Sequence, residues 1–552
     1  MNSPTILSKV IALAMTLVIS QATAGSFPEE SHKWRDDHDR RSALTEPAFV
    51  TVSGGQLMGA KVDGVYAFKG IPYATAQRYQ EPQPTSWVNI KKALAFGETC
   101  PNGAQTVNVH EFVTESNHDM VENENCLSLN VWTTSLADKS FWRRGGQPKP
   151  VIVWIHGGGF SSGSSAELPY YEGANLADHQ DVVFVSVNHR LNVLGYLDLS
   201  AYGPEWAATG NLGQLDLVAA LRWVRDNATQ FGGDASNVTI VGQSGGAGKV
   251  MTLLGMPSAQ GLFHKAVVLS GGSAGQSQTN ARAAAARLFT TLGISTVEEL
   301  RQIPYRRLID AAASARVGAS PVIDGVVYPA ATVTAGKFTE LARDIPIIVS
   351  NTFGEFCGNS VSLTAWNTSA NPLADVYRPE TSPARVNELL TQRFGAAKEA
   401  IVQEFRRVYP GHDLFDLLFF AVGCGPNRLA TADAKAAQAG APVYSAVYAL
   451  NLPWFGGVVS VHTGGDLPFV LDNPQTIPHL IAGGEEDAYR QARDASTALG
   501  NFARTGDPSD QRLRWPAYKP DTQWTMIFDK RSRALKRGDR DLSDKILSTR
   551  TP

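Results

Sequence analysis

Ser244 lies in the sequence Gly-Gln-Ser-Gly-Gly at positions 242–246. The run at 237–241 before it has the composition of a strand, and residues 247–256 after it can form a helix. A sharp strand-to-helix turn exposes a serine hydroxyl and needs glycines on both sides, where side chains would clash. The five residues alone also fit a simple turn. Their place between a strand and a helix predicts a nucleophilic serine near the positive end of the helix dipole.

A second glycine-rich segment, His-Gly-Gly-Gly-Phe at 156–160, follows directly after the apolar run 151–155. Consecutive glycines allow backbone N–H groups to converge on a developing oxyanion. A purely structural loop and a phosphate-binding loop are the alternatives. A phosphate-binding loop needs Lys and then Ser or Thr after its last glycine, where this chain has Phe160.

Short apolar runs, each followed by a polar or glycine-rich turn, indicate buried strands. Between the second and third runs, apolar residues from Leu217 to Ala228 recur at helical spacing. Repetition of strand, helix and strand predicts an α/β fold, with a mostly parallel central sheet flanked by helices and active-site residues at the carboxyl ends of its strands. The expected strands are 151–155, 182–187, 238–241, 266–269, 345–349 and 442–447.

Composition is that of a globular protein with a large core: 552 residues, 43% of them hydrophobic, and a formal net charge of -3. Without a long basic run, a nucleic-acid partner is not expected, and a small, largely uncharged substrate fits better. Length alone suggests three or more domains. However, the candidate residues are scattered from 156 to 462 with no low-complexity linker. We therefore expect one domain with large insertions over 46–552, preceded by a charged, flexible segment at 25–45.

The first 24 residues have the three parts of a secretory signal peptide. Lys9 precedes an apolar run at 10–19, and Ala-Thr-Ala at 22–24 resembles a cleavage site. A membrane anchor is the alternative, but a bilayer requires ~20 apolar residues. We therefore expect cleavage near Ala24, export to the periplasm or beyond, and no stable membrane insertion.

The chain has four cysteines, and the expected export would allow them to form disulfides, because oxidising compartments permit such bonds. Four cysteines allow three pairings. Cys100 and Cys126 are the preferred pair, since they close a loop of modest length. For Cys357 and Cys424 the sequence leaves two alternatives, a second disulfide and buried free thiols.

Beyond these two motifs, the chain resembles the type-B carboxylesterase/lipase family, which includes the cholinesterases, from about Val52 to Tyr518. Many short segments match in the family's order. They are Phe-Lys-Gly-Ile-Pro-Tyr-Ala at 68–74, Cys-Leu-Ser-Leu-Asn-Val-Trp at 126–132, the glycine run at 156–160, Asn-His-Arg-Leu at 188–191, Gly-Asn-Leu-Gly at 210–213, Phe-Gly-Gly-Asp at 231–234, Pro-Val-Ile-Asp-Gly at 321–325 and Phe-Ala-Arg-Thr-Gly-Asp-Pro at 502–508.

The resemblance implies a role for each candidate residue. It implies that Ser244 is the nucleophile, His462 the base and Glu355 the acid, the last placed just past the expected strand 345–349. Asp324 is a rival acid, but the family uses this Asp-Gly pair for structure. The amides of Gly158, Gly159 and Gly245 form the oxyanion hole by the same resemblance.

Three residues around Ser244 depart from the family pattern. The family usually has Glu before the nucleophile and Ala after it, whereas this chain has Gln243 and Gly245. The lost negative charge leads us to expect a weaker preference for cationic leaving groups. Lys249 replaces a small residue, and if its helix is buried it needs a carboxylate or carbonyl partner.

These residues together predict a carboxylic ester hydrolase of modest selectivity, acting through a Ser-His-Glu triad and an acyl-enzyme on small-molecule esters. No metal or organic cofactor is expected. An amidase or peptidase with the same triad is one alternative. A non-catalytic cholinesterase-like binding protein is another, and the filled triad positions argue against it. The sequence leaves the natural ester and the oligomeric state open.

Overall fold

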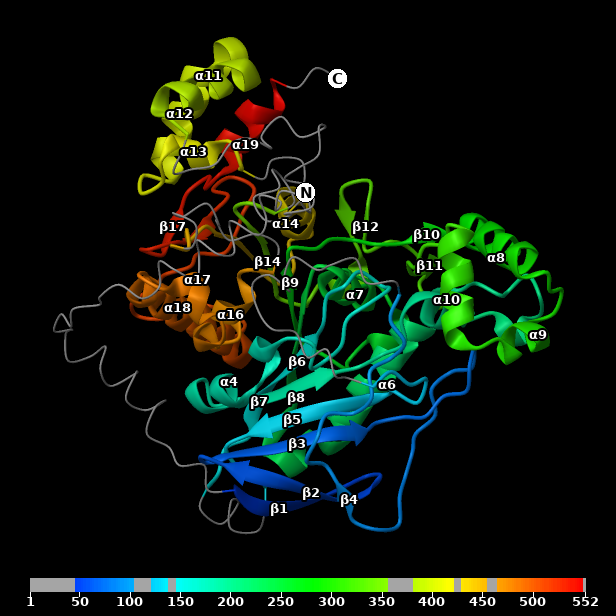
Figure 1. Ribbon diagram of the computed structural model, residues 1–552. Coiled ribbons are helices and arrows are strands. Elements are labelled where there is room, and N and C mark those ends of the chain that lie inside the picture. Colours follow the sequence, from blue (N-terminus) through cyan, green and yellow to red (C-terminus); the bar gives the residue numbers. More distant parts are fainter. Residues whose placement is uncertain are drawn as a thin grey trace, which may run out of the picture. The chain divides into compact units, whose positions relative to one another are not determined.

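A large central sheet organises the chain (Figure 1), seen here in a computed structural model that describes residues 45–103, 121–137, 145–355, 381–420, 428–453 and 464–549. Its strands run in the order β1-β2-β3-β5-β7-β6-β8-β9-β14-β15-β16-β17, and β4 pairs with β2. The strands are β1 Thr45–Val52, β2 Gly55–Val62, β3 Val65–Pro72, β4 Lys91–Lys92, β5 Ser128–Thr133, β6 Lys149–Ile155, β7 Val183–Val187, β8 Gly233–Gln243, β9 Lys265–Leu269, β14 Ile347–Thr352, β15 Val443–Tyr448, β16 Thr525–Phe528 and β17 Arg533–Leu535.

From β7 to β16 every neighbouring pair of strands is parallel, and antiparallel strands extend the sheet on both sides. All six strands expected from apolar runs are present, so the predicted α/β fold with a mostly parallel sheet is confirmed. In β6, β7, β9 and β15 every residue is buried. Burial on both faces explains why these strands are continuous apolar runs rather than alternating ones.

Helices cover both faces of the sheet. Val151, Val153 and Ile155 of β6 belong to one hydrophobic cluster, whereas Ile152 and Trp154 belong to the other. The first cluster includes side chains of α6 Leu212–Asn227, α7 Gly245–Leu254 and α14 Arg428–Ala437. The second includes side chains of α4 Ala174–His179, α16 Leu467–Val470 and α18 Glu485–Thr505.

Two further hydrophobic clusters lie in helical additions to this layered core. One joins α8 Gln278–Leu292, α9 Val297–Gln302 and α10 Tyr305–Ser314 with α5 Asn192–Tyr196. The other joins α11 Pro383–Phe394, α12 Lys398–Val408 and α13 Leu414–Leu417 with α19 Arg540–Leu547. Figure 1 shows α8, α9 and α10 in green and α11, α12 and α13 in yellow, outside the central sheet.

Residues 1–44, which include the expected signal peptide and nearly all of the expected charged segment at 25–45, lie outside the described residues. The signal peptide, its cleavage near Ala24 and the single-domain boundaries therefore stay predictions. Within the described ranges, no helix is both long and apolar enough to cross a membrane.

Candidate active site

Ser244 forms the turn between β8, which ends at Gln243, and α7, which begins at Gly245. Its backbone has φ 54° and ψ −120°, a conformation that a residue with a side chain rarely adopts. The Ser244 N–H donates to the carbonyl of Leu269 at the end of β9 (2.8 Å), and its own carbonyl accepts from Gly248 N–H (3.0 Å). The turn is therefore fixed from the neighbouring strand and from its own helix.

Glycines surround this turn because backbone segments approach it closely. A Cβ atom at Gly242 would lie 2.4 Å from the backbone of Gly246, and one at Gly246 would lie 2.1 Å from the Ile155 carbonyl oxygen. No side chain fits at such distances. The Gly-x-Ser-x-Gly spacing thus reflects the packing of β8 and α7 against the end of β6.

We call residues 156–160 the glycine loop; it leaves the carboxyl end of β6 beside Ser244. Gly158 and Gly159 have φ values of 78° and 62°, which favour glycine. Gly157 is buried, and a Cβ atom placed on it would lie 3.7 Å from Ser244 Cβ. Among the described residues, the N–H groups of Gly158, Gly159 and Gly245 have no hydrogen-bond acceptor. Three amide donors thus remain available next to the serine.

Gly245 packs directly against this loop. A Cβ atom on Gly245 would lie 2.1 Å from the Gly159 carbonyl oxygen and 2.4 Å from Gly159 Cα. The contact is with backbone, so no side-chain rotation can relieve it. The loop therefore lies too close to the turn for the alanine that the resemblance leads one to expect at 245.

Gly245→Ala should displace the glycine loop and lower kcat for p-nitrophenyl esters about 10- to 100-fold. Losing one oxyanion donor outright costs about 10²- to 10³-fold, and a displaced donor should cost less. Gly272→Ala is the matched control, because a Cβ atom there has nothing within 4 Å. Steady-state kinetics of both variants checks the prediction. Wild-type kcat in Gly245→Ala would contradict it.

Glu355 lies just beyond the carboxyl end of β14 and is 5% exposed. Its Oε1 accepts from Ser270 Oγ (2.6 Å) and from Thr352 N–H (2.7 Å), while its own N–H donates to Thr352 Oγ1 (3.2 Å). Its φ of 25° is unusual for a residue with a side chain. Ser270 directly follows β9, so the strand next to the serine turn also anchors the carboxylate.

Asp466 is a second buried carboxyl group in this region and is 0% exposed. Burial, and then the charge of Glu355, raises the pKa of Asp466 to about 8. Within the described residues, neither of its side-chain oxygens has a hydrogen-bond partner. Asp466 is therefore mainly protonated at pH 7.

Asp324, the rival acid, holds a turn instead. Its Oδ1 accepts from the N–H groups of Val326 (2.9 Å) and Tyr328 (3.1 Å), and its Oδ2 accepts from Asn211 Nδ2 (3.0 Å). These bonds use both oxygens to fix local backbone and the start of α6. The arrangement agrees with a structural role for the Asp-Gly pair.

Of the proposed triad, the structure describes Ser244 and Glu355, and His462 lies outside the described residues. Cys357 and Cys424 lie outside them as well. Ser270, the hydroxyl partner of Glu355, was not predicted. The sequence shows only that Ser270 follows an expected strand. Many other polar residues do the same, so this position did not single it out.

Lys249 is buried, with 0% of its surface exposed, and its Nζ donates to the carbonyl of His156 at 3.1 Å. The expectation that it needs a carbonyl or carboxylate partner is confirmed. Gln243 is also buried, and a Cβ atom on Gly157 would lie 3.0 Å from its Oε1. A neutral amide therefore stands against the glycine loop where the family usually has a carboxylate.

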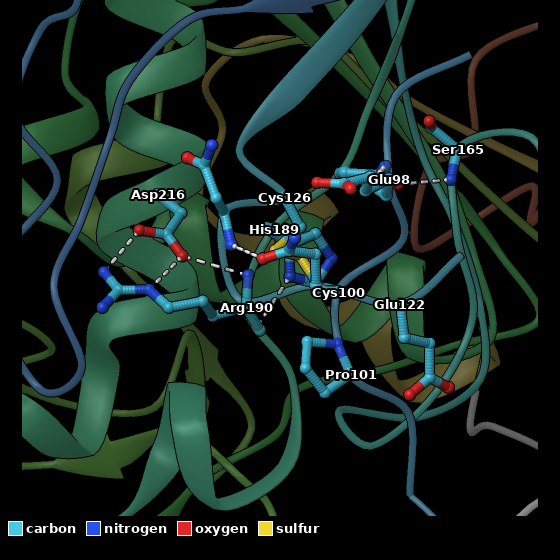
Figure 2. Close-up of a disulfide and its surroundings, with 12 residues drawn as sticks. Glu98, Cys100, Pro101, Glu122, Cys126, Ser165, His189, Arg190 and Asp216 are labelled. Carbon is cyan, nitrogen blue, oxygen red and sulfur yellow. Dashed lines mark hydrogen bonds and ion pairs between the residues drawn. A yellow bond between two sulfur atoms is a disulfide. The ribbon is translucent and has the colours of Figure 1, made fainter. Parts of the chain in front are cut away.

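A disulfide joins Cys100 and Cys126, as preferred from the sequence. Figure 2 shows it beside His189 and the ion pair of Arg190 and Asp216, whose closest atoms are 2.6 Å apart. The His189 ring stacks on His156, the first residue of the glycine loop, with ring centroids 4.8 Å apart. The disulfide thus lies in the surroundings of the two stacked imidazoles at the start of the glycine loop.

Comparison with known proteins agrees with this geometry. The sequence pattern described as the Carboxylesterase family matches residues 46–545. The para-nitrobenzyl esterase of Bacillus subtilis is 31% identical, over 87% of this chain and 94% of that protein. The phenmedipham hydrolase of Pseudarthrobacter oxydans is 30% identical, over 88% of this chain and 95% of that protein.

A solved structure of an esterase from Clostridium hathewayi, described as able to hydrolyse aliphatic aromatic polyesters, has a TM-score of 0.79 and 33% identity to this chain. It covers 92% of this chain and all of its own. The relatives named here are esterases or hydrolases matched over most of their length, and the serine turn and glycine loop are in place. The chain belongs to the carboxylesterase family and is a carboxylic ester hydrolase.

Proposed function

We propose that this protein hydrolyses uncharged carboxylic esters through a Ser244-His462-Glu355 triad and an acyl-enzyme intermediate. The observation that carries the proposal is the strained Ser244 turn, packed against a glycine loop whose amides have no acceptor among the described residues. A nucleophile and an oxyanion hole are the two parts that acyl transfer requires.

The chemistry follows from the weak nucleophilicity of a neutral hydroxyl. His462 accepts the Ser244 proton as Oγ attacks the ester carbonyl, and Glu355 balances the charge of the resulting imidazolium. The amides of Gly158, Gly159 and Gly245 stabilise the oxyanion until the alcohol leaves with the proton from His462. Water, activated by the same histidine, then cleaves the acyl-enzyme and restores Ser244.

Uncharged substrates are supported by the neutral Gln243 beside the nucleophile and by the near-zero net charge of -3. The relatives named for para-nitrobenzyl esters and for phenmedipham also suggest aromatic esters or carbamates as substrates to test. Export is the expected setting. The Cys100–Cys126 disulfide supports it, because such bonds persist in oxidising compartments.

Covalent labelling tests the nucleophile directly. A fluorophosphonate should add once to the folded protein, on the tryptic peptide 226–249, which contains Ser236 and Ser244. Fragment ions should place the adduct on Ser244, and heat-unfolded protein should remain unlabelled. An adduct on Ser236, or none on folded protein that hydrolyses esters, would contradict Ser244 as the nucleophile.

A further inference from the structure

The side chain of Lys249 reaches back from α7 to the glycine loop. Its Nζ donates to the His156 carbonyl (3.1 Å), approaches the Gly157 carbonyl (3.5 Å) and lies 5.8 Å from the ring centroid of Phe160. All three contacts are with the glycine loop, which carries two of the three proposed oxyanion amides. Lys249 is therefore placed to affect those amides without touching substrate.

The two carbonyls matter because of the peptide groups to which they belong. The His156 carbonyl shares its peptide plane with the Gly157 N–H, and the Gly157 carbonyl shares its plane with the Gly158 N–H. A cation on a carbonyl oxygen polarises the whole amide and makes its N–H a stronger donor. The Gly158 N–H is one of the proposed oxyanion donors.

We propose that Lys249 is a positioning residue for ester hydrolysis, whose ammonium group fixes the glycine loop and strengthens the Gly158 N–H toward the oxyanion. The proposal rests on the function proposed above. It also links two departures from the family pattern. Gly245 allows the glycine loop to approach the serine turn closely, and Lys249, one turn further along α7, holds the start of that loop.

The burial of this charge argues for a role beyond packing. Within the described part of the chain, no carboxylate lies within ion-pair distance of Lys249 Nζ. A buried ammonium without a counter-ion is strongly unfavourable, and an apolar side chain of similar length would avoid that penalty. Retaining a lysine here is easier to explain if its charge serves the reaction.

The histidines on the neighbouring elements are neutral, so Lys249 carries the positive charge beside the glycine loop. His156 follows β6 and His189 follows β7. Burial first, and then the Lys249 charge, lowers the pKa of each histidine well below its usual value. Both imidazoles are therefore neutral near pH 7. Burial also lowers the pKa of Lys249 to about 7, and the Glu167 carboxylate opposes this shift.

The protonation state of Lys249 sets the direction in which kcat changes with pH. Below pH 7 the ammonium form predominates and polarises the loop, but the catalytic histidine must also be neutral for the reaction to proceed. As the pH rises above 7, Lys249 loses its proton and the glycine loop loses the polarising charge. Wild-type kcat should therefore fall on the alkaline side of neutrality, provided that the ester is corrected for spontaneous hydrolysis.

Two substitutions separate charge from hydrogen bonding. Lys249→Met removes both, whereas Lys249→Gln keeps an amide donor without a charge. We expect Lys249→Met to lower kcat about 10- to 50-fold with KM within about twofold, because an oxyanion donor is weakened rather than lost. Lys249→Gln should fall between Lys249→Met and wild type. Neither variant should retain the alkaline decline of kcat.

Lys435→Met provides a closely matched control. Lys435 is also 0% exposed, and its Nζ donates to the carbonyls of Ala342 (2.7 Å) and Arg343 (2.8 Å). It lies 5.7 Å from the ring centroid of Phe338, and burial lowers its pKa to about 8. These carbonyls precede β14 and lie at the amino end of the sheet, away from Ser244. The wild-type pH profile should persist in this variant.

A trifluoromethyl ketone that forms a hemiketal with Ser244 gives a readout specific to the oxyanion. Its Ki should rise about 10-fold in Lys249→Met and stay unchanged in Lys435→Met. Wild-type kcat, Ki and pH profile in both Lys249 variants would overturn the proposal, as would an equal loss in Lys435→Met. If Lys249→Met does not fold, the kinetics of Lys249→Gln and the pH profile of the wild type still test the proposal. Failure of wild-type protein to label at Ser244 would instead refute the proposed nucleophile.

Discussion

Replacing Ser244 by alanine is expected to lower kcat for p-nitrophenyl esters by about 10⁵-fold or more, leaving a residual rate from the oxyanion hole and substrate binding. Alanine removes the hydroxyl that the turn from β8 to α7 presents beside the glycine loop. Stability should change little. The two hydrogen bonds that fix the turn are made by the Ser244 backbone, which alanine retains.

Initial rates after removal of contaminating esterases, together with thermal unfolding, would measure both effects. Ser236→Ala is a suitable control, because Ser236 is exposed near the other end of β8 and should be dispensable. More than about 1% of wild-type kcat in a folded Ser244→Ala protein would contradict the mechanism, since a lost nucleophile leaves far less.

Six of the seven strands in the parallel half of the sheet could be predicted, because their buried parts read as apolar runs. β16, a strand of only four residues, was not predicted. The ends of the six strands were harder to predict. β8 begins at Gly233, before the apolar part expected to start at Val238, and β14 continues through Ser350 to Thr352. In β14 these polar residues pair with β15, as Ser350 does with Ala446. The pattern of apolar residues in β14 does not indicate that it pairs with β15, which lies almost a hundred residues further along the chain.

The antiparallel strands that precede β6 were not predicted, and their burial explains why. In β3 the pattern alternates irregularly between buried and half-buried positions, and a register shift lies between Phe68 and Ile71. Such a strand gives neither a continuous apolar run nor strict alternation. The helical additions form further hydrophobic clusters, one of which includes Val447 of β15 and Ile527 of β16, and a search for sheet strands does not identify these helices.

Within the site, motifs made of neighbouring residues could be predicted, whereas contacts between residues far apart in the sequence could not. The Ser244 turn and the glycine loop are local motifs. The Gly245–Gly159 contact is not local, because it depends on the register that sets Ile155 of β6 against Gly242 of β8. Ser270 on Glu355 and the burial of Asp466 likewise require elements far apart in the chain. Glu355 itself was reached only through the family resemblance.

The second large effect concerns Glu355. Glu355→Gln should lower kcat about 10³- to 10⁴-fold, because an amide cannot balance the charge of an imidazolium and favours the wrong histidine tautomer. The glutamine Oε1 can still accept from Ser270 Oγ and Thr352 N–H, so the fold should survive. Steady-state kinetics and thermal unfolding at pH 7 would measure the two effects separately. A folded variant with kcat within about tenfold of wild type would exclude Glu355 as the acid.

Asp466 makes the pH dependence of this variant informative. In the wild type, burial and the Glu355 charge hold the pKa of Asp466 near 8, so the group is mainly neutral at pH 7. Glu355→Gln removes the second cause, and Asp466 should then ionise at lower pH and supply part of the missing charge. Residual kcat should therefore rise with pH in Glu355→Gln and stay flat in the double variant with Asp466→Asn. If the two variants have identical profiles, Asp466 does not substitute for Glu355, and the buried negative charge at this site comes from Glu355 alone.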